Sequence, residues 1–292
     1  MKQIYDRMTT TLYRDVSLND LVGGGDPRKV GESTLKILVS LDAICESSVI
    51  FDIGCGCGRT AIEQAKMLSR GRYIGFDIIP PLIEFCSEQI SSALPNTEFH
   101  LSNAENPLYS TYIDPKINYV EFDEMDISPS LITAFSVFTH FDYSTAMSYF
   151  KRMRSKLAPD GSICVSMFLL NEASKARIDA GRSNLQFDTG EQEVVFGDKG
   201  RPLVRVGWNE GFLRKSLLEA GLEIHRVVYG NWSGTFAEPY QDYLLLKPTV
   251  YVPDDFDPER YLKLNSDLVD HNVNPHHHYV NYGRFEENRH YK

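Results

Sequence analysis

Three glycines at alternate positions, Gly54, Gly56 and Gly58, follow directly on a short apolar run in the segment VIFDIGCGCGRT, residues 49–60. The apolar run predicts a buried strand, and the residues that follow the glycines have the composition of a helix. A glycine turn between a strand and a helix lets the backbone approach a nucleotide-like ligand, because no Cβ atom stands in the way. The segment therefore predicts an α/β fold with such a ligand at this turn.

Strand and helix patterns alternate along most of the chain. Strands are expected at 49–53, 72–76, 97–101, 130–137 and 162–168, and helices at 29–43, 60–69, 80–93, 143–157 and 209–220. This order predicts a doubly wound, mostly parallel sheet with right-handed crossovers. Two further strands, 222–229 and 241–246, are expected to complete the sheet with an antiparallel edge.

Changes in composition and pattern along the chain suggest three parts. Residues 1–28 are expected to be a lead-in that ends in a glycine- and proline-rich breaker. Residues 29–248 are expected to form the main domain, in which the less regular stretch 171–207 is interpreted as an insertion on the substrate side. Residues 249–292 are expected to form a small helical module with two short amphipathic helices joined at Asn272–Pro275.

The composition limits the classes of partner and compartment. The net charge of −10 disfavours nucleic acid as a partner, because binding phosphates needs clustered Lys and Arg. No apolar run is long enough for a membrane-spanning helix, and the N-terminal residues lack the apolar region of a signal peptide. The five cysteines form no disulfide pattern, which favours a reducing, cytoplasmic location.

The spacing of the glycines separates two cofactor classes. A dinucleotide fingerprint needs its third glycine where Arg59 stands. The G-x-G-x-G pattern after Asp52 resembles motif I of class I, Rossmann-like S-adenosylmethionine-dependent methyltransferases instead. The resemblance implies a seven-stranded sheet of the methyltransferase type and S-adenosyl-L-methionine as cofactor. It also implies that Asp52 holds the methionine amino group and that the backbone at Gly54 and Gly56 passes beneath the ligand. Arg59 either reaches the methionine carboxylate or caps a surface.

The next two strands end in residues that suit the ribose and the adenine. Asp77 ends an apolar strand about 20 residues after the glycine turn, where a carboxylate accepts hydrogen bonds from ribose hydroxyls. An NAD site has the same requirement, and a helix N-cap is the structural alternative. In the family, Ile78 would pack on the adenine. Asn103 stands where the family usually has an Asp that contacts the adenine amino group, and the backbone of Ala104 would serve the ring.

The segment SVFTH, residues 136–140, resembles the methyltransferase segment that faces the transferred methyl group. Ser136 is assigned to the cofactor site by this resemblance. A near-neutral imidazole suits the removal of a proton from a hydroxyl group, so His140 is the candidate general base. The alternative is a histidine at a helix start that bonds the backbone.

A pattern G-x-W-x-G…QD, seen in a subset of these enzymes, indicates the acceptor side. Trp232 would stack on a sugar or another flat apolar group, and Gln241 or Asp242 would bind its hydroxyls; a core tryptophan is the alternative. No metal site is expected, because the three adjacent histidines, 276–278, would point in different directions on a helix.

The segment 254–292 resembles a short module found beside glycosyltransferases, although Ser266 stands where proline is usual. These resemblances together favour O-methylation of a carbohydrate or other small-molecule hydroxyl by in-line displacement. The alternatives are N-methylation of a small molecule or a protein, and a non-catalytic cofactor-binding subunit of a glycan-synthesis complex that docks a protein through residues 254–292. An NAD-dependent dehydrogenase is a further, weaker alternative.

Overall fold

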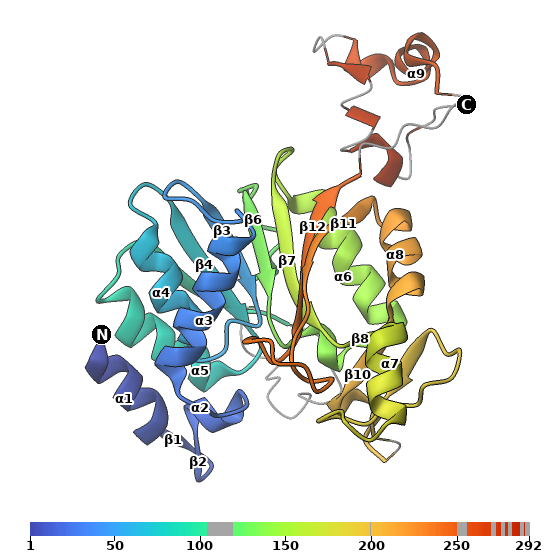
Figure 1. Cartoon of the computed structure of the whole chain (residues 1–292). Coiled ribbons are helices and arrows are strands. Elements are labelled where there is room, and N and C mark those ends of the chain that lie inside the picture. Colours follow the sequence, from blue (N-terminus) through green and yellow to red (C-terminus); the bar gives the residue numbers. More distant parts are fainter. Residues whose placement is uncertain are drawn as a thin grey trace.

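A seven-stranded sheet with the strand order β11-β12-β7-β6-β3-β4-β5 forms the centre of the molecule (Figure 1). The computed structural model describes residues 1–103, 119–198, 200–249 and, in the C-terminal segment, 256–269, 273–275, 278–279, 282–286 and 289. The strands of the sheet are β3 (Val49–Ile53), β4 (Arg72–Asp77), β5 (Thr97–Leu101), β6 (Leu131–Ala134), β7 (Ser162–Met167), β11 (Leu222–Val228) and β12 (Asp242–Pro248).

The pairing of the strands confirms the predicted topology. Strands β5, β4, β3, β6 and β7 are parallel neighbours, and β12 is antiparallel to both β7 and β11. One strand is shorter than expected, because β6 ends at Ala134 rather than continuing to residue 137. Ser136 has a φ of 59°, in the left-handed region that a strand does not allow, so the chain leaves the sheet there.

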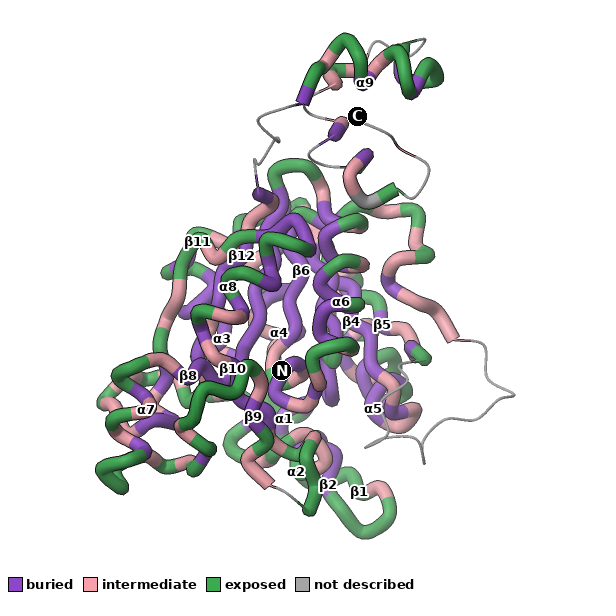
Figure 2. The backbone as a smooth tube through the Cα atoms, turned by 90° about the vertical axis from the view of Figure 1, so that its right-hand side faces the viewer, coloured by how far each residue is buried: buried purple, intermediate pink, exposed green. Residues whose placement is uncertain are grey.

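Helices cover both faces of the sheet, and two apolar clusters fill the space between them. On one face lie α3 (Pro27–Ser40), α4 (Arg59–Met67) and α5 (Pro80–Phe85), and on the other lie α6 (Tyr143–Lys156) and α8 (Glu210–Glu219). Successive side chains of β3 point to opposite faces and so contribute to both clusters. Ile50 packs on the α3–α4 side and Phe51 on the α6 side. Figure 2 shows the buried central strands between the more exposed helices.

The helix expected at 80–93 changes its form midway. It begins as α5 and continues as a π-helical segment, η1 (Cys86–Ser91). The buried residues of η1 lie beneath the glycine turn: the Cys86 thiol donates to the carbonyl oxygen of Gly56 at 3.5 Å. A Cβ atom at Gly58, where φ is +79°, would collide with Ile90 of the same segment. The third glycine of the pattern therefore allows helix and turn to pack closely.

The lead-in belongs to the main fold rather than preceding it. It contains α1 (Lys2–Thr10), the short strands β1 (Leu12–Tyr13) and β2 (Val16–Ser17), and α2 (Leu18–Leu21). Tyr5 and Met8 are buried in the α3–α4 cluster, and the Tyr5 hydroxyl donates to the Glu63 carboxylate at 2.7 Å. The segment from α2 to the start of α3 then passes beside the glycine turn.

The stretch 171–207 forms a small structure of its own. It contributes α7 (Glu172–Asp179), β9 (Val194–Phe196), the 3₁₀ helix η4 (Pro202–Val204) and the start of β10 (Val206–Asn209). Together with β8 (Leu169–Leu170), the strands make a three-stranded sheet in the order β8-β10-β9. A separate apolar cluster that includes Phe168, Phe187 and Trp232 supports it.

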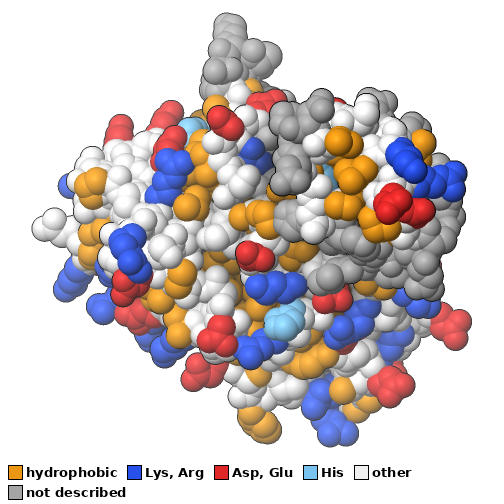
Figure 3. Space-filling view, turned by 90° about the horizontal axis from the view of Figure 1, so that it is seen from above, with side chains coloured by type: hydrophobic (Ala, Val, Ile, Leu, Met, Phe, Trp, Pro, Cys, Tyr) orange, Lys and Arg blue, Asp and Glu red, His pale blue; other side chains and the backbone are white. Residues whose placement is uncertain are grey.

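The C-terminal segment leaves the sheet from the end of β12, which pairs with the beginning of β7. Its described elements are α9 (Pro258–Leu264) and the 3₁₀ helices η5 (Ser266–Leu268) and η6 (Gly283–Phe285). Four buried side chains pack together, namely Phe256, Tyr261, Leu268 and Tyr279. Asn272, at the expected junction of two helices, lies outside the described residues. On the face with this segment, acidic and basic side chains are interspersed (Figure 3). No helix in the described part of the chain has the length and apolar character needed to cross a membrane.

Candidate functional site

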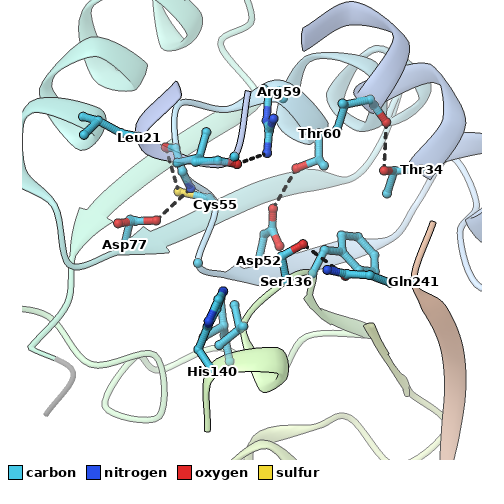
Figure 4. A pocket seen from close by; sticks show the side chains of 18 of the residues that line it. Leu21, Thr34, Asp52, Cys55, Arg59, Thr60, Asp77, Ser136, His140 and Gln241 are labelled. Carbon is cyan, nitrogen blue, oxygen red and sulfur yellow. Dashed lines mark hydrogen bonds between the residues drawn. The ribbon is translucent and has the colours of Figure 1, made fainter. Parts of the chain in front are cut away.

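A cavity of about 1210 Å³ opens at the carboxyl ends of the parallel strands. Nine residues singled out from the sequence line it: Asp52, Gly54, Gly56, Arg59, Asp77, Ile78, Ser136, His140 and Gln241. They come from the ends of β3, β4 and β6, from the start of α4 and from the residue before β12, and Figure 4 shows most of them around one space. The topology explains this convergence, since parallel strands bring their carboxyl ends to the same edge of a sheet.

The glycine turn packs closely against neighbouring side chains at the cavity wall. Gly54 and Gly56 have φ values of +75° and +57°, which residues other than glycine rarely adopt. A Cβ atom at Gly54 would lie 2.5 Å from Cγ2 of Val137, and one at Gly56 would lie 2.9 Å from Cγ1 of Val22. The turn is therefore restricted to glycine by both conformation and space, and the passage of its backbone beneath a bound ligand stays a prediction.

Asp52 is buried within a cluster of hydroxyl groups. Its carboxylate accepts hydrogen bonds from Thr133 at 2.7 Å, from Thr60 at 3.0 Å and from the phenol of Tyr73. Burial raises the pKa of Asp52, and the three hydroxyl donors act against that rise. The pattern of the sequence did not indicate these donors, which fix the carboxylate at the cavity wall. The contact of Asp52 with a methionine amino group stays a prediction.

Asp77 joins the end of β4 to the glycine turn. One carboxylate oxygen accepts the backbone N–H of Gly56 at 2.8 Å, and the other accepts that of Ile79 at 3.0 Å. Burial raises the pKa of Asp77 to about 6. Ile79, not Asp77, occupies the N-cap position of α5, so the cap alternative does not describe this residue. Ile78 lies beside Asp77 in the cavity wall.

Arg59 connects α4 to the lead-in. Its guanidinium donates to the carbonyl oxygens of Val22 at 2.6 Å and Gly24 at 2.7 Å. Burial lowers the pKa of Arg59, and neutral carbonyls do not cancel its charge. Val22 and Gly24 themselves line the cavity, a role that the sequence analysis missed. The available signal was the run Gly23–Gly25, in which all three residues have a positive φ.

The expected adenine contacts are less well placed. Asn103 is exposed, its backbone N–H donates to the Glu121 carboxylate at 2.8 Å, and Ser102 lines the cavity in its stead. Ala104 lies outside the described residues, as does most of the loop that follows. The roles of Asn103 and Ala104 stay predictions.

His140 ends the 3₁₀ helix η3 (Phe138–His140), and its ring lies in the cavity wall. Its Nδ1 lies 2.9 Å from the carbonyl oxygen of Leu203. A carbonyl only accepts, so Nδ1 carries the proton and Nε2 keeps its lone pair. Burial lowers the pKa of His140, which keeps the ring neutral at pH 7. Nδ1 thus bonds the backbone, as expected of a structural histidine. Nε2 keeps the lone pair that a general base requires.

Ser136 and Gln241 are joined opposite the glycine turn. The Ser136 hydroxyl donates to Oε1 of Gln241 at 3.1 Å, and the Ser166 hydroxyl donates to the same oxygen at 2.6 Å. The Ser136 backbone N–H donates to the Ser166 hydroxyl at 2.7 Å. These bonds link the ends of β6 and β7 to the start of β12.

Trp232 and Asp242 do not take the acceptor-binding positions expected from the sequence. The Trp232 side chain is 1% exposed in an apolar cluster, so its ring is not available for stacking. Asp242 is buried and accepts three N–H groups at 2.7 Å each, from the Trp232 indole and the backbones of Leu169 and Gly230. Neighbouring residues on a strand point to opposite faces, so Asp242 turns away from the cavity that Gln241 lines. This buried position of Trp232 is the one that the core alternative describes.

Among the residues that the structure describes, no group of three or more His, Cys, Asp or Glu side chains is arranged to hold a metal ion. His276 and His277 lie outside those residues. The five cysteines have no disulfide partner, and Cys55 at the glycine turn is buried.

Several solved structures, methyltransferases among them, share the fold. A Pyrococcus horikoshii OT3 protein is 14% identical, with a TM-score of 0.52 over 85% of this chain and 100% of that one. An S-adenosylmethionine-dependent methyltransferase from Clostridium acetobutylicum is 14% identical, with a TM-score of 0.50 over 85% and 97%. The magnesium protoporphyrin IX methyltransferase of Synechocystis PCC 6803, solved with bound SAH (S-adenosylhomocysteine), is 14% identical, with a TM-score of 0.50 over 85% and 94%.

A family model described as a methyltransferase domain matches residues 45–223, more than half of the chain. The match begins just before β3 and includes the glycine turn, Asp77, His140 and the β6–β7 part of the cavity. The chain belongs to this methyltransferase-domain family and is an S-adenosylmethionine-dependent methyltransferase.

Proposed function

We propose that this methyltransferase acts on a hydroxyl group of a carbohydrate acceptor and that His140 is the general base. The observation that carries the proposal is the bond from Nδ1 of His140 to the Leu203 carbonyl oxygen. It leaves Nε2 as a proton acceptor in the wall of the cavity. An alcohol is a weak nucleophile at neutral pH and gains from a base, whereas a neutral amine needs little help.

The cofactor side of the cavity is assigned to the glycine turn and its neighbours. Asp77 would accept the ribose hydroxyls, Ile78 would pack on the adenine, and the backbone at Gly54 and Gly56 would lie beneath the nucleoside. Arg59 would face the methionine carboxylate, because within the described residues its guanidinium bonds two carbonyl oxygens and forms no ion pair. When bound, S-adenosylmethionine supplies a methyl group on a positively charged sulfur that departs as a neutral thioether.

The chain itself then has two tasks, orientation and proton transfer. The cavity holds the acceptor oxygen in line with the methyl carbon, which accounts for much of the rate in a displacement of this kind. Nε2 of His140 takes the proton of the hydroxyl, and the Leu203 carbonyl stabilises the imidazolium that forms. We assign residues 171–207 to the acceptor side, since Arg201 and Val204 of this stretch line the same cavity.

The carbohydrate part of the proposal draws on the resemblance of residues 254–292 to a module beside glycosyltransferases. This segment does not begin near the cavity, because it leaves β12 at the end of the sheet opposite the cavity. We therefore assign the segment to docking of a glycan-synthesis partner rather than to catalysis.

The proposal is tested by transfer of a labelled methyl group to sugars, sugar nucleotides, glycans and amines. His140→Ala should abolish most transfer to hydroxyl acceptors. His225→Ala, at an exposed position on β11, is the matched control and should behave as the wild type. Transfer to amines alone, unaffected by His140→Ala, would contradict the proposal and favour N-methylation.

A further inference from the structure

We propose that Gln241 determines acceptor specificity by donating its side-chain N–H to an oxygen on the carbon next to the hydroxyl that His140 deprotonates. The acceptor class that fits is a compound with oxygens on adjacent carbons, such as the vicinal diol of a sugar ring. This inference rests on the proposed O-methylation and names what the same site recognises.

The orientation of the Gln241 amide follows from Ser166. The Ser166 side chain is fully buried on β7, so its hydroxyl proton needs an acceptor within the protein. Its oxygen already receives the backbone N–H of Ser136 at 2.7 Å, and its proton points to Oε1 of Gln241 at 2.6 Å. The Ser136 hydroxyl donates to the same Oε1 at 3.1 Å. Two donors therefore fix the amide oxygen, and the amide nitrogen is directed away from them.

The position of Gln241 places that nitrogen at the cavity. Tyr243 lies opposite Ser166 in the β12–β7 pair, and Gln241, two residues earlier, is on the same face. Both Gln241 and Tyr243 line the cavity. No hydrogen bond from Nε2 of Gln241 to any described residue accompanies the two bonds that Oε1 accepts. The amide thus has two N–H groups to offer a ligand.

The backbone of Ser136 supports a functional role for this arrangement. A φ of 59° is unfavourable for a serine, and such conformations persist where surrounding bonds hold them. Here the left-handed turn brings the Ser136 N–H onto Ser166 and its hydroxyl onto Gln241. The strained residue follows β6, four positions before His140. The same turn therefore positions the donor on Gln241 and leads into the helix that carries the acceptor, Nε2 of His140.

The two side chains make complementary demands on one substrate. His140 needs a group that donates a proton, and Gln241 needs an atom that accepts a hydrogen bond. A hydroxyl with an oxygen on the adjacent carbon satisfies both, whereas a lone hydroxyl leaves the amide without a partner. Loss of one such bond weakens transition-state binding about tenfold or more.

The test compares Gln241→Glu with Gln192→Glu, an exposed residue outside the cavity wall. The carboxylate introduced by Gln241→Glu keeps an acceptor for both serines and lacks the N–H groups. The probes are methyl glycosides that are methylated, each paired with the analogue deoxygenated at the carbon adjacent to the methylated position. We expect Gln241→Glu to lower kcat/KM at least about tenfold for the glycoside and less than about twofold for its deoxy analogue. SAH affinity and the Gln192→Glu enzyme should be unchanged.

A second readout is independent of turnover. In the SAH-bound, ¹⁵N-labelled protein, the side-chain amide signal of Gln241 is identified by its absence in Gln241→Glu. The glycoside should shift this signal, and the deoxy analogue should not. Equal kcat/KM losses for both probes, or equal signal shifts, would overturn the inference while leaving O-methylation intact. Transfer to amines with no glycoside methylated would overturn the proposed function, and the inference with it.

Discussion

The carbonyl oxygen of Leu203 holds Nδ1 of His140 at 2.9 Å, so a residue 63 positions further along the chain sets the tautomer of the candidate base. Leu203 belongs to η4, within the small structure that follows β7. His140 belongs to the turn after β6. The base therefore depends on two parts of the chain that are brought together only by the fold.

Replacing His140 tests the base directly. His140→Gln keeps a polar side chain at this position without an imidazole, and we expect kcat to fall about 10²- to 10⁴-fold with SAH affinity unchanged. Because burial lowers the pKa of His140, the wild-type rate should rise with pH along a titration curve whose midpoint lies below the ordinary histidine pKa of about 6.5. Kinetics over pH 5–8 and calorimetric titration of SAH measure both effects. A mutant that retains wild-type turnover would exclude His140 as the base.

Asp77 should make cofactor binding depend on pH. Its pKa is raised to about 6 by burial, and in the proposed site the ionised form is the one that would accept both ribose hydroxyls. Protonation as the pH falls through 6 removes acceptor capacity, so SAH affinity should fall about tenfold between pH 7 and pH 5. Calorimetric titration across this range gives the profile. Asp77→Asn is the control, and it should bind SAH more weakly at pH 7.5, without the step near pH 6.

Gly56 and Val22 should show coupled effects on cofactor binding. Gly56→Ala introduces a methyl group 2.9 Å from Cγ1 of Val22 and forces alanine to a φ of +57°. We expect a loss of stability of about 1–2 kcal/mol from the backbone alone and weaker SAH binding. Val22→Ala in the same chain removes the collision but not the backbone strain, so it should restore part of the loss. Full additivity of the two single mutations in denaturant titrations would argue against a direct contact.

Trp232→Phe should affect stability rather than acceptor recognition. The change removes the indole N–H that Asp242 accepts at 2.7 Å within a buried cluster. Loss of this bond to a charged group should cost about 1.5–3 kcal/mol, seen as a lower Tm. KM for the acceptor should stay within about twofold, since the ring is buried and outside the cavity that contains His140. A large rise in the KM for the acceptor at unchanged Tm would instead support stacking of Trp232 on the acceptor.

The sheet could be predicted from local patterns because each strand carries its own signal. Five apolar runs separated by helical segments determine a parallel order, and β5 matches its expected limits, 97–101. The limits of β6 could not be predicted in this way. Nothing in the apolar run 130–137 shows that Ser136 adopts a left-handed turn, because the bonds that hold it come from Ser166 and Gln241.

Most residues singled out for the cofactor side line the cavity, whereas Trp232 and Asp242 of the acceptor side do not, for a related reason. Gly54 and Gly56 line the cavity with their backbone in a turn at a strand end, and Asp77 lines it with a carboxylate on the last residue of β4, so adjacent residues determine all three positions. Gln241 and Asp242 act through side chains whose direction depends on where β12 begins. Strict alternation already required these two neighbours to face opposite ways, and applying it would have excluded one of them from the cavity. The lead-in contacts of Arg59 had no comparable local signal.

The chain leaves β12 at the end of the strand that is remote from the cavity. A partner docked on the C-terminal segment would therefore be separated from the reacting groups. If a partner docks on residues 254–292 as proposed, we expect it to change turnover through the effective concentration of acceptor rather than through the walls around His140. Tethering beside a source of acceptor raises the local supply of that acceptor at a constant intrinsic rate. Under this proposal, we expect exchange of the C-terminal segment to redirect the enzyme to another source of acceptor without changing its intrinsic rate.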